Sequence, residues 1–243
     1  MTISKDQHVG ELVAQDYKLA QIFKDHKIDF CCNGDRSLSD VCEKKNISTD
    51  SLIKKLENAA AQKGQENINF DAWPLDLLAD YIEKTHHRYV EKQSVVLKAY
   101  LDKLCKVHGN QHPELHEIKT LFNDSTGELA AHMKKEELIL FPFIKKMNTA
   151  KETQQEMPKA SFETVENPIE MMMHDHDAEG ERFRKIAELS NDYTPPEDAC
   201  QTYRVTFSLL EEFENDLHKH IHLENNMLFP KAIALEKESL TAV

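Results

Sequence analysis

The chain has 243 residues, enough to bury a substantial core in one or two domains. It carries 43 Asp and Glu against 30 Lys and Arg, a formal net charge of −13. Because a nucleic-acid interface needs a basic face, this balance argues against nucleic acid as a partner. The sequence also has no run of about 18 apolar residues, so we expect no membrane span.

The N-terminus and the cysteines together predict a cytoplasmic protein. Residues 1–10 are polar and do not resemble an export signal. An odd number of cysteines, mostly far apart in sequence, fits reduced thiols better than a disulfide framework. The cysteines are Cys31, Cys32, Cys42, Cys105 and Cys200.

Residues 1–65 are expected to form a small helical N-terminal domain. Ser37 and Ser48 are suitable N-caps for helices over residues 38–45 and 49–61, because their hydroxyls can accept from the free amides of the first turn. Only six glycines occur in the whole chain, and no apolar run alternates as a strand would. These features predict an all-α protein.

A polar stretch over residues 62–71 indicates a linker, and Pro74 can open the next helix. Residues 66–243 then form a second domain, in which residues 148–167 have no clear period and read as a crossover loop. Four long amphipathic helices in series are typical of an antiparallel four-helix bundle. We expect them over residues 74–107, 113–147, 168–189 and 196–236.

The second and fourth of these helices contain an internal repeat at a constant offset of 88 residues. The repeat pairs His132 with His220 and Glu136 with Glu224, and Leu-Phe-Pro follows in both copies. Since residues four apart share one face of an α-helix, each copy presents an imidazole beside a carboxylate. A single such pair is an ordinary surface feature of helices, but its recurrence in register favours a metal site.

Apolar periodicity selects histidines from the first and third helices. His86 continues the apolar row of the first helix, whereas His87 lies four residues after Glu83 on the polar side. In the third helix, His176 falls in line with the apolar residues, while His174 follows Glu170 by four.

The same test in the fourth helix keeps His220 and sets aside His218 and His222, which share a face with polar residues. Helix lengths place His86 and His132 at the same level. The helix lengths fit less well for His176 and His220. His220 lies roughly 36 Å from the expected start of the fourth helix, whereas His176 lies about 20 Å from the end of the third. Either the expected boundaries are wrong there, or the start of the fourth helix overhangs.

Six ligands are more than one tetrahedral zinc ion can bind. A set of nitrogen and oxygen donors without thiolate suits two iron or manganese ions better. The two glutamates could bridge the ions, with an oxo or hydroxo bridge and an open position for a small ligand. Glu128, Asp175 and Asp216 could accept from the imidazole N–H groups. The expected ligands are His86, His132, Glu136, His176, His220 and Glu224.

Three motifs carry a family resemblance. The stretches that begin at His132, Met172 and His220 resemble those of the hemerythrin-like RIC family, the repair of iron centres di-iron proteins. The Asp-Phe-Cys-Cys-Asn-Gly stretch that begins at Asp29 is similar to the small N-terminal domain of that family. The resemblance covers almost the whole chain.

The resemblance implies two iron ions per chain on the six ligands, with Glu128 and Asp175 beside them. It implies a cytoplasmic protein, expected as a homodimer, that repairs iron–sulfur clusters damaged by nitrosative or oxidative stress. Iron–sulfur proteins would be its clients, and nitric oxide or oxygen its small ligands. The vicinal pair Cys31 and Cys32 could be a redox or iron-handling dithiol, or simply two small residues that pack a turn.

Two functions of different class follow. In the first, the protein supplies iron or removes nitric oxide reductively, so that damaged clusters recover; in the second, it binds or senses oxygen or nitric oxide reversibly, as hemerythrins do. The first is favoured, because an oxygen carrier has no need of a separate domain with a cysteine pair.

Overall fold

The structure, a computed structural model, describes residues 2–61 and 68–241. These residues form helices and no β-strand, with one isolated bridge between His8 and Ser37, which confirms the all-α prediction. None of the helices in the described part is long and apolar enough to cross a membrane. The expected domain boundary after residue 65 lies outside the described residues.

The N-terminal unit is built from short helices joined by turns. Ser37 Oγ accepts from the backbone N–H of Asp40 at 3.1 Å, and Ser48 Oγ from that of Ser51 at 3.4 Å. Both hydroxyls therefore cap the helices that the sequence assigns to them. The helices are α1 (Val9–Gln15), α2 (Leu19–Asp25), α3 (Leu38–Lys45) and α4 (Thr49–Ala61).

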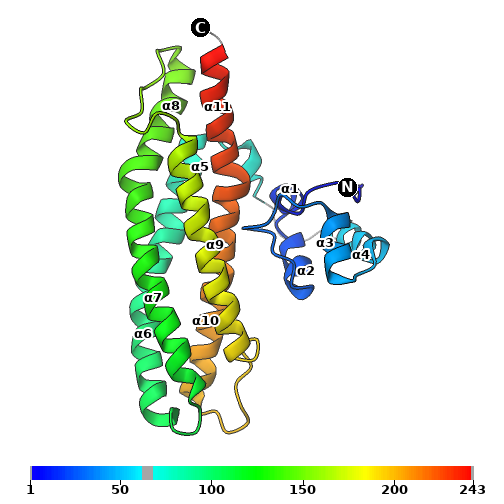
Figure 1. Ribbon diagram of the computed structural model, residues 1–243, viewed down its shortest axis with the longest axis vertical. Helices are drawn as coiled ribbons and strands as arrows, with labels where there is room; N and C mark the ends of the chain where they lie inside the picture. Colours follow the sequence, from blue (N-terminus) through cyan, green and yellow to red (C-terminus); the bar gives the residue numbers. More distant parts are fainter. Residues whose placement is uncertain (1, 62–67, 242–243) are drawn as a thin grey trace.

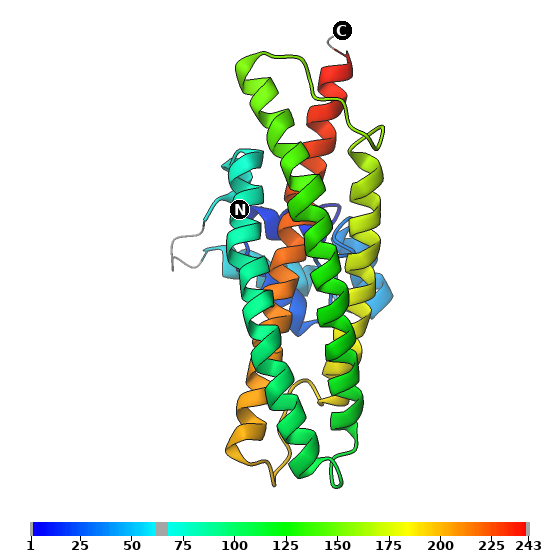
Figure 2. The same ribbon diagram turned by 90° about the vertical axis from the view of Figure 1, so that its left-hand side faces the viewer.

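The second unit is an antiparallel bundle of four rods, which lie side by side in Figures 1 and 2. A short turn, η1 (Phe70–Ala72), precedes it. The first rod contains α5 (Leu75–Tyr81), η2 (Ile82–His87) and α6 (Arg88–His108), and the second α7 (Glu114–Lys135), η3 (Glu136–Leu140) and α8 (Phe141–Thr153). The third is α9 (Glu166–Leu189), and the fourth contains α10 (Gln201–Leu223), η4 (Glu224–Leu228) and α11 (Phe229–Thr241).

Three expected boundaries were wrong, one of them the end of the fourth rod, at Thr241 instead of residue 236. The second rod continues to Thr153 instead of ending at residue 147, which leaves residues 154–165 as the crossover. The fourth rod begins at Gln201 instead of residue 196, because the backbone at Cys200 is still extended. The later start brings His220 to roughly 28 Å from the beginning of its rod, so about half of the expected overhang disappears.

The segments η2, η3 and η4 are single π-helical turns within the rods. Prolines explain two of them. Pro142 and Pro230 have no N–H for the carbonyl oxygens of Leu138 and Asn226 four residues earlier, and their rings crowd those carbonyls. The chain widens into a π turn just before each proline, at Glu136–Leu140 and Glu224–Leu228.

The N-terminal unit lies against the side of the bundle formed by α9 and α10, near mid-height (Figure 1). Asn226 Nδ2 in η4 donates to the carbonyl oxygen of Phe30 at 3.1 Å. Gly10 and Gly34 allow this close approach, since a Cβ at Gly34 would lie 2.6 Å from the Phe30 carbonyl and 2.7 Å from Asn226 Oδ1. Lys27 adds an ion pair to Asp192 at 3.1 Å.

We predict that Gly34→Ala destabilises the protein by about 1–3 kcal/mol, because the added methyl group meets backbone that cannot move aside cheaply. A loss of this size lowers the melting temperature by roughly 2–4 °C for each kcal/mol in a chain of this length. Thermal unfolding followed by circular dichroism measures it.

Gly127→Ala is the matched control, because Gly127 lies within α7 and an added Cβ has no atom within 4 Å. We expect this variant to be stabilised by about 0.5–1 kcal/mol through helix propensity. Equal melting temperatures for the two variants would contradict the close packing of Gly34 against Phe30 and Asn226.

Candidate metal centre

Six buried side chains converge in the interior of the bundle, with at least one from each rod. Each of them is at most 3% exposed. They form two groups of four that share both carboxylates, and the potential ligand atoms within each group all lie within 4.8 Å of one another. One group is His87, Glu136, His220 and Glu224; the other is His132, Glu136, His176 and Glu224.

In the first group the imidazoles of His87 and His220 face the two carboxylates. His87 Nε2 lies 3.4 Å from Glu136 Oε2 and 3.9 Å from Glu224 Oε1. His220 Nε2 lies 3.0 Å from Glu224 Oε1, across one turn of the same helix. Each carboxylate is thus within reach of a cation held by these two rings.

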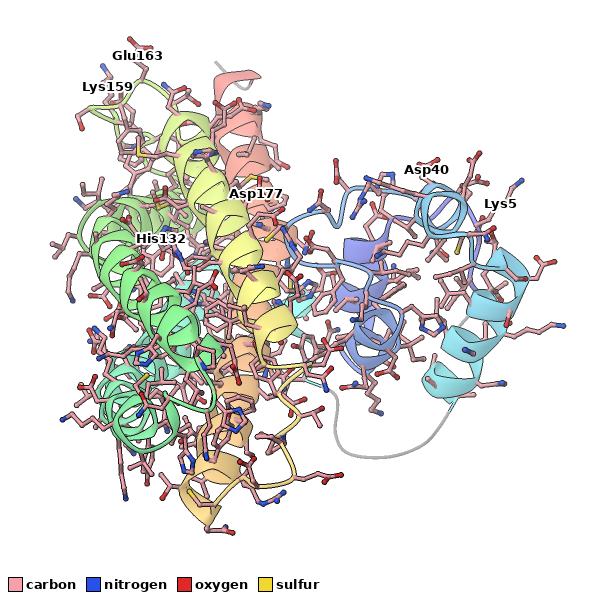
Figure 3. The ribbon with its side chains drawn as sticks, turned by 60° about the horizontal axis from the view of Figure 1, so that its bottom comes forward. Lys5, Asp40, His132, Lys159, Glu163 and Asp177 are labelled. Carbon is pink, nitrogen blue, oxygen red and sulfur yellow. The ribbon has the colours of Figure 1, made fainter. Side chains whose placement is uncertain are left out.

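The second group mirrors the first on the other side of the carboxylates. His132 Nε2 lies 3.4 Å from Glu136 Oε1, and His176 Nε2 lies 3.1 Å from Glu224 Oε2. The two Nε2 atoms are only 3.0 Å apart. Figure 3 marks His132 on α7, where this helix meets α9.

Several buried atoms of this centre have no hydrogen-bond partner. They are His87 Nε2, His220 Nδ1, both oxygens of Glu136 and Glu224 Oε2. Leaving such atoms unpaired away from water costs free energy, most of all for a carboxylate. Imidazole and carboxylate donors without thiolate suit iron or manganese, so the residues present fit a cation at this position.

The carboxylates also set the protonation of the facing histidines. Burial lowers the pKa of His87, but the nearby carboxylates of Glu136 and Glu224 outweigh it and raise that pKa to about 10. In the same way, burial opposes and the charge of Glu136 raises the pKa of His132, to about 9. Burial dominates at His220, whose pKa is lowered. Without a cation, protons on His87 and His132 balance the two carboxylates.

Of the two adjacent histidines of the first rod, the structure gathers His87 into these groups, whereas the sequence favoured His86. His87 is fully buried and belongs to the centre, whereas His86 belongs to neither group. His86 is also buried, and its Nδ1 lies 2.9 Å from Asp216 Oδ1. The reason is the π turn η2, whose hydrogen bonds span five residues instead of four. With one extra residue in the turn, both histidines face inward, and periodicity of 3.6 residues no longer separates them.

Carboxylate and amide oxygens hold the outer nitrogens of three histidines of the centre. Glu137 Oε1 lies 3.1 Å from His87 Nδ1, and Asp175 Oδ2 lies 3.3 Å from His132 Nδ1. The corresponding partner of His176 Nδ1 is the neutral amide oxygen of Asn225, at 2.8 Å. These contacts place the proton on Nδ1 and leave Nε2 free for a cation. Sequence reasoning missed Glu137 and Asn225, although each directly follows a glutamate of the centre.

The other acidic residues considered from the sequence lie elsewhere. Asp216 contacts His86, and Nδ1 of His220 has no hydrogen-bond partner. Glu128 is exposed and lines a cavity of about 90 Å³ between α7 and α9. Its wall includes His132 and His176, so this cavity reaches the edge of the metal centre.

The cysteine pair lies in the N-terminal unit, directly against α9. Cys31 is buried and Cys32 partly buried, and both thiols are free. Cys32 Sγ lies 3.5 Å from the carbonyl oxygen of His176. The Cys31 carbonyl accepts from Asn225 Nδ2 at 3.3 Å, and the same amide holds the His176 ring. The N-terminal unit therefore reaches to within one residue of the metal centre.

A helical bundle with a buried histidine and glutamate centre defines a cation-binding protein of the hemerythrin class. Residues 78–232 match the family model described as the hemerythrin HHE cation binding domain. Residues 5–60 match a second model, described as a domain of unknown function, DUF542.

Relatives in three bacteria share both parts. The iron-sulfur cluster repair protein ScdA of Staphylococcus epidermidis is 31% identical over 94% of this chain and 99% of its own length. The iron-sulfur cluster repair proteins YtfE of Pectobacterium atrosepticum and Yersinia pseudotuberculosis are 35% and 31% identical, each over 94% of this chain and 97% of its own length. The chain belongs to this hemerythrin-like family of ScdA and YtfE proteins, as its motifs indicated.

We predict that His87→Ala lowers the bound iron by about half, because one of the two groups loses a ligand. His86→Ala, the adjacent control, should keep its iron. Elemental analysis of both purified variants, with circular dichroism to confirm that they fold, measures the difference. If His86→Ala loses iron and His87→Ala keeps it, then His86 is the ligand and the assignment of His87 is wrong.

The alkaline stability of the metal-free chain tests the raised pKa values. Because the pKa of His87 and His132 in the folded chain exceeds the ordinary 6.5, their pairing stabilises the metal-free fold fully below about pH 6.5. This contribution is lost as pH rises through about 9 to 10. Iron competes with the same protons, so iron affinity should instead increase with pH over this range.

Thermal unfolding of the metal-free chain from pH 6 to 10 measures the loss. The variant Glu136→Gln/Glu224→Gln should lose much less stability in that window, because the two carboxylates that contribute most to both raised pKa values are gone. A metal-free wild-type chain whose stability increases between pH 8 and 10 would contradict the assignment.

Proposed function

We propose that the bundle holds two iron ions per chain, one in each group of four residues. His87 and His220 would ligate one ion and His132 and His176 the other, and Glu136 and Glu224 would serve both. The observation that carries this proposal is that the two groups share both carboxylates, whose oxygens have unpartnered positions in a dry interior. A carboxylate shared between two cations offsets part of the charge of each, which a buried site requires.

The ligand chemistry supports iron or manganese over zinc, and the hemerythrin-like family supports iron. Zinc sites with histidine and carboxylate ligands are typically tetrahedral and complete with four donors, whereas this centre offers six donors in a continuous cluster. Facing helices of a four-helix bundle are a common place for two-iron carboxylate centres. We propose an oxo or hydroxo bridge between the ions and a position left for a small ligand.

We propose that the chain repairs iron–sulfur clusters, as the printed names of its ScdA and YtfE relatives state of those proteins. Iron–sulfur proteins would be its clients, and clusters damaged by nitrosative or oxidative stress its targets. A two-iron centre supplies transferable iron and one-electron redox chemistry when loaded. The chain's own residues keep this centre away from bulk water, since all six ligands are almost fully buried.

The cavity beside His132 and His176 supports access by a small molecule or an ion to one side of the centre. It holds about 90 Å³ and is lined by the acidic residues Glu128, Asp175 and Glu179. This space admits a small molecule such as nitric oxide but not a whole iron–sulfur cluster together with the protein that holds it. Repair would therefore proceed by iron leaving the centre or by reductive removal of nitric oxide at it, without insertion of a damaged cluster into the bundle.

Glu136→Gln/Glu224→Gln tests the proposed repair. This double variant preserves shape but removes both shared charges, so we expect it to lose nearly all bound iron and the ability to reactivate a nitrosylated iron–sulfur enzyme. The assay follows recovered enzyme activity after addition of the reduced, iron-loaded protein. His86→Ala is the control that should repair normally.

Wild-type protein that forms a stable, reversible dioxygen adduct without reactivating the damaged enzyme would support the alternative, hemerythrin-like binding or sensing, and overturn repair. The homodimer and the cytoplasmic location belong to the same proposal. Light scattering on the iron-loaded protein measures the first, and cell fractionation the second.

A further inference from the structure

We propose that Asp29, Cys31 and Cys32 form a separate cation site, selective for thiophilic divalent ions, at the seam between the N-terminal unit and the bundle. Its ligand atoms lie within 4.8 Å of one another, as in the bundle centre. Cys31 Sγ is 3.8 Å from Cys32 Sγ and 3.4 Å from Asp29 Oδ1. This inference rests on the proposed function only in taking the ion to be iron.

The turn at Asp29 presents both thiols on the same side. Asp29 Oδ1 accepts the backbone N–H of Cys31 at 3.1 Å and that of Cys32 at 3.0 Å. Asp29 Oδ2 accepts from Asn33 Nδ2 at 2.8 Å. The pair is thus held in place before any ion arrives, which lowers the entropic cost of binding.

A stable disulfide is a poor alternative for this pair. Consecutive Cα atoms lie 3.80 Å apart across a trans peptide, below the 4.4–6.8 Å that disulfides usually span. The described residues contain no cis peptide bond, so Cys31 and Cys32 follow the trans spacing. Two thiols that are close together but poorly placed for mutual oxidation are suited to bind one soft or borderline cation between them.

The surrounding charge favours a cation. Asp177 lies on α9 toward the N-terminal unit (Figure 3). Arg184 is the cationic neighbour, at 3.3 Å from Asp29 Oδ2, but its charge is shared with Glu181 at 2.6 Å. Three carboxylates therefore face one guanidinium.

Binding of a divalent ion would form two metal–sulfur bonds and release the S–H protons of Cys31 and Cys32 to solvent. No electron moves in this step. The bound ion would lie next to the carbonyl of His176, since Cys32 Sγ is 3.5 Å from that oxygen. Such a position is a transit site for iron between the bundle centre and the exterior of the protein.

Cobalt(II) tests the site without iron chemistry or a repair assay, because thiolate–cobalt coordination absorbs in the near ultraviolet. We expect anaerobic titration of the full chain to show this absorption with about one equivalent more bound metal than in Cys31→Ser/Cys32→Ser. Glu136→Gln/Glu224→Gln should lose the bundle metal but keep the thiolate band. Cys200→Ser, which removes an exposed thiol elsewhere, should change nothing.

The single variant Cys32→Ser covers the case in which the double variant fails to fold, since Cys32 is only partly buried. It should weaken cobalt affinity at the thiolate site by more than about 100-fold. Loss of a residue that only supports a ligand typically weakens metal affinity by about 10- to 100-fold. A wild-type chain without a thiolate band, or a band that survives in Cys32→Ser at full affinity, would overturn the site. Neither result depends on whether the protein repairs clusters, so the two proposals fail separately.

Discussion

The structure depends on two carboxylates buried in the middle of a helical bundle. Glu136 and Glu224 are fully buried, and an isolated ionised carboxylate in such surroundings would cost many kcal/mol. The fold offsets this cost with imidazoles on every side, protonated or bound to a cation. The same electrostatic demand links the stability of the metal-free chain to its affinity for iron, because protons and metal compete for the same nitrogens.

The backbone geometry around these carboxylates also connects the two units. Glu224 opens the π turn η4, and the next two residues turn their amides toward the N-terminal unit. Asn225 holds His176 with one end of its amide and the carbonyl of Cys31 with the other. The irregular turn that places a carboxylate in the centre therefore also docks the small unit beside it.

Much of this arrangement could be predicted from the sequence, and the exceptions have physical causes. The in-register repeat pointed to His132, Glu136, His220 and Glu224, and apolar periodicity to His176, because regular helix geometry holds around these residues. Periodicity cannot separate His86 from His87, because a π turn intervenes there and both side chains are buried. Leu-Phe-Pro accompanies the π turns of the second and fourth rods. No proline follows η2, so the π turn of the first rod has no such signal in the sequence. Asn225 could not be selected from the sequence, since its role depends on contacts with residues 49 and 194 positions away.

The bridging amide of Asn225 limits what a shortened protein can report. A bundle produced without its N-terminal unit would leave one end of that amide without its acceptor and would uncover the α9 surface next to His176. The side chain could then rotate and present its NH₂ group to Nδ1 of the ring. This would favour the opposite tautomer, in which Nε2 carries the proton and has no lone pair for a cation. An excised bundle would thus keep the group with His87 and His220 as in the full chain, whereas the group with His132 and His176 would bind metal differently.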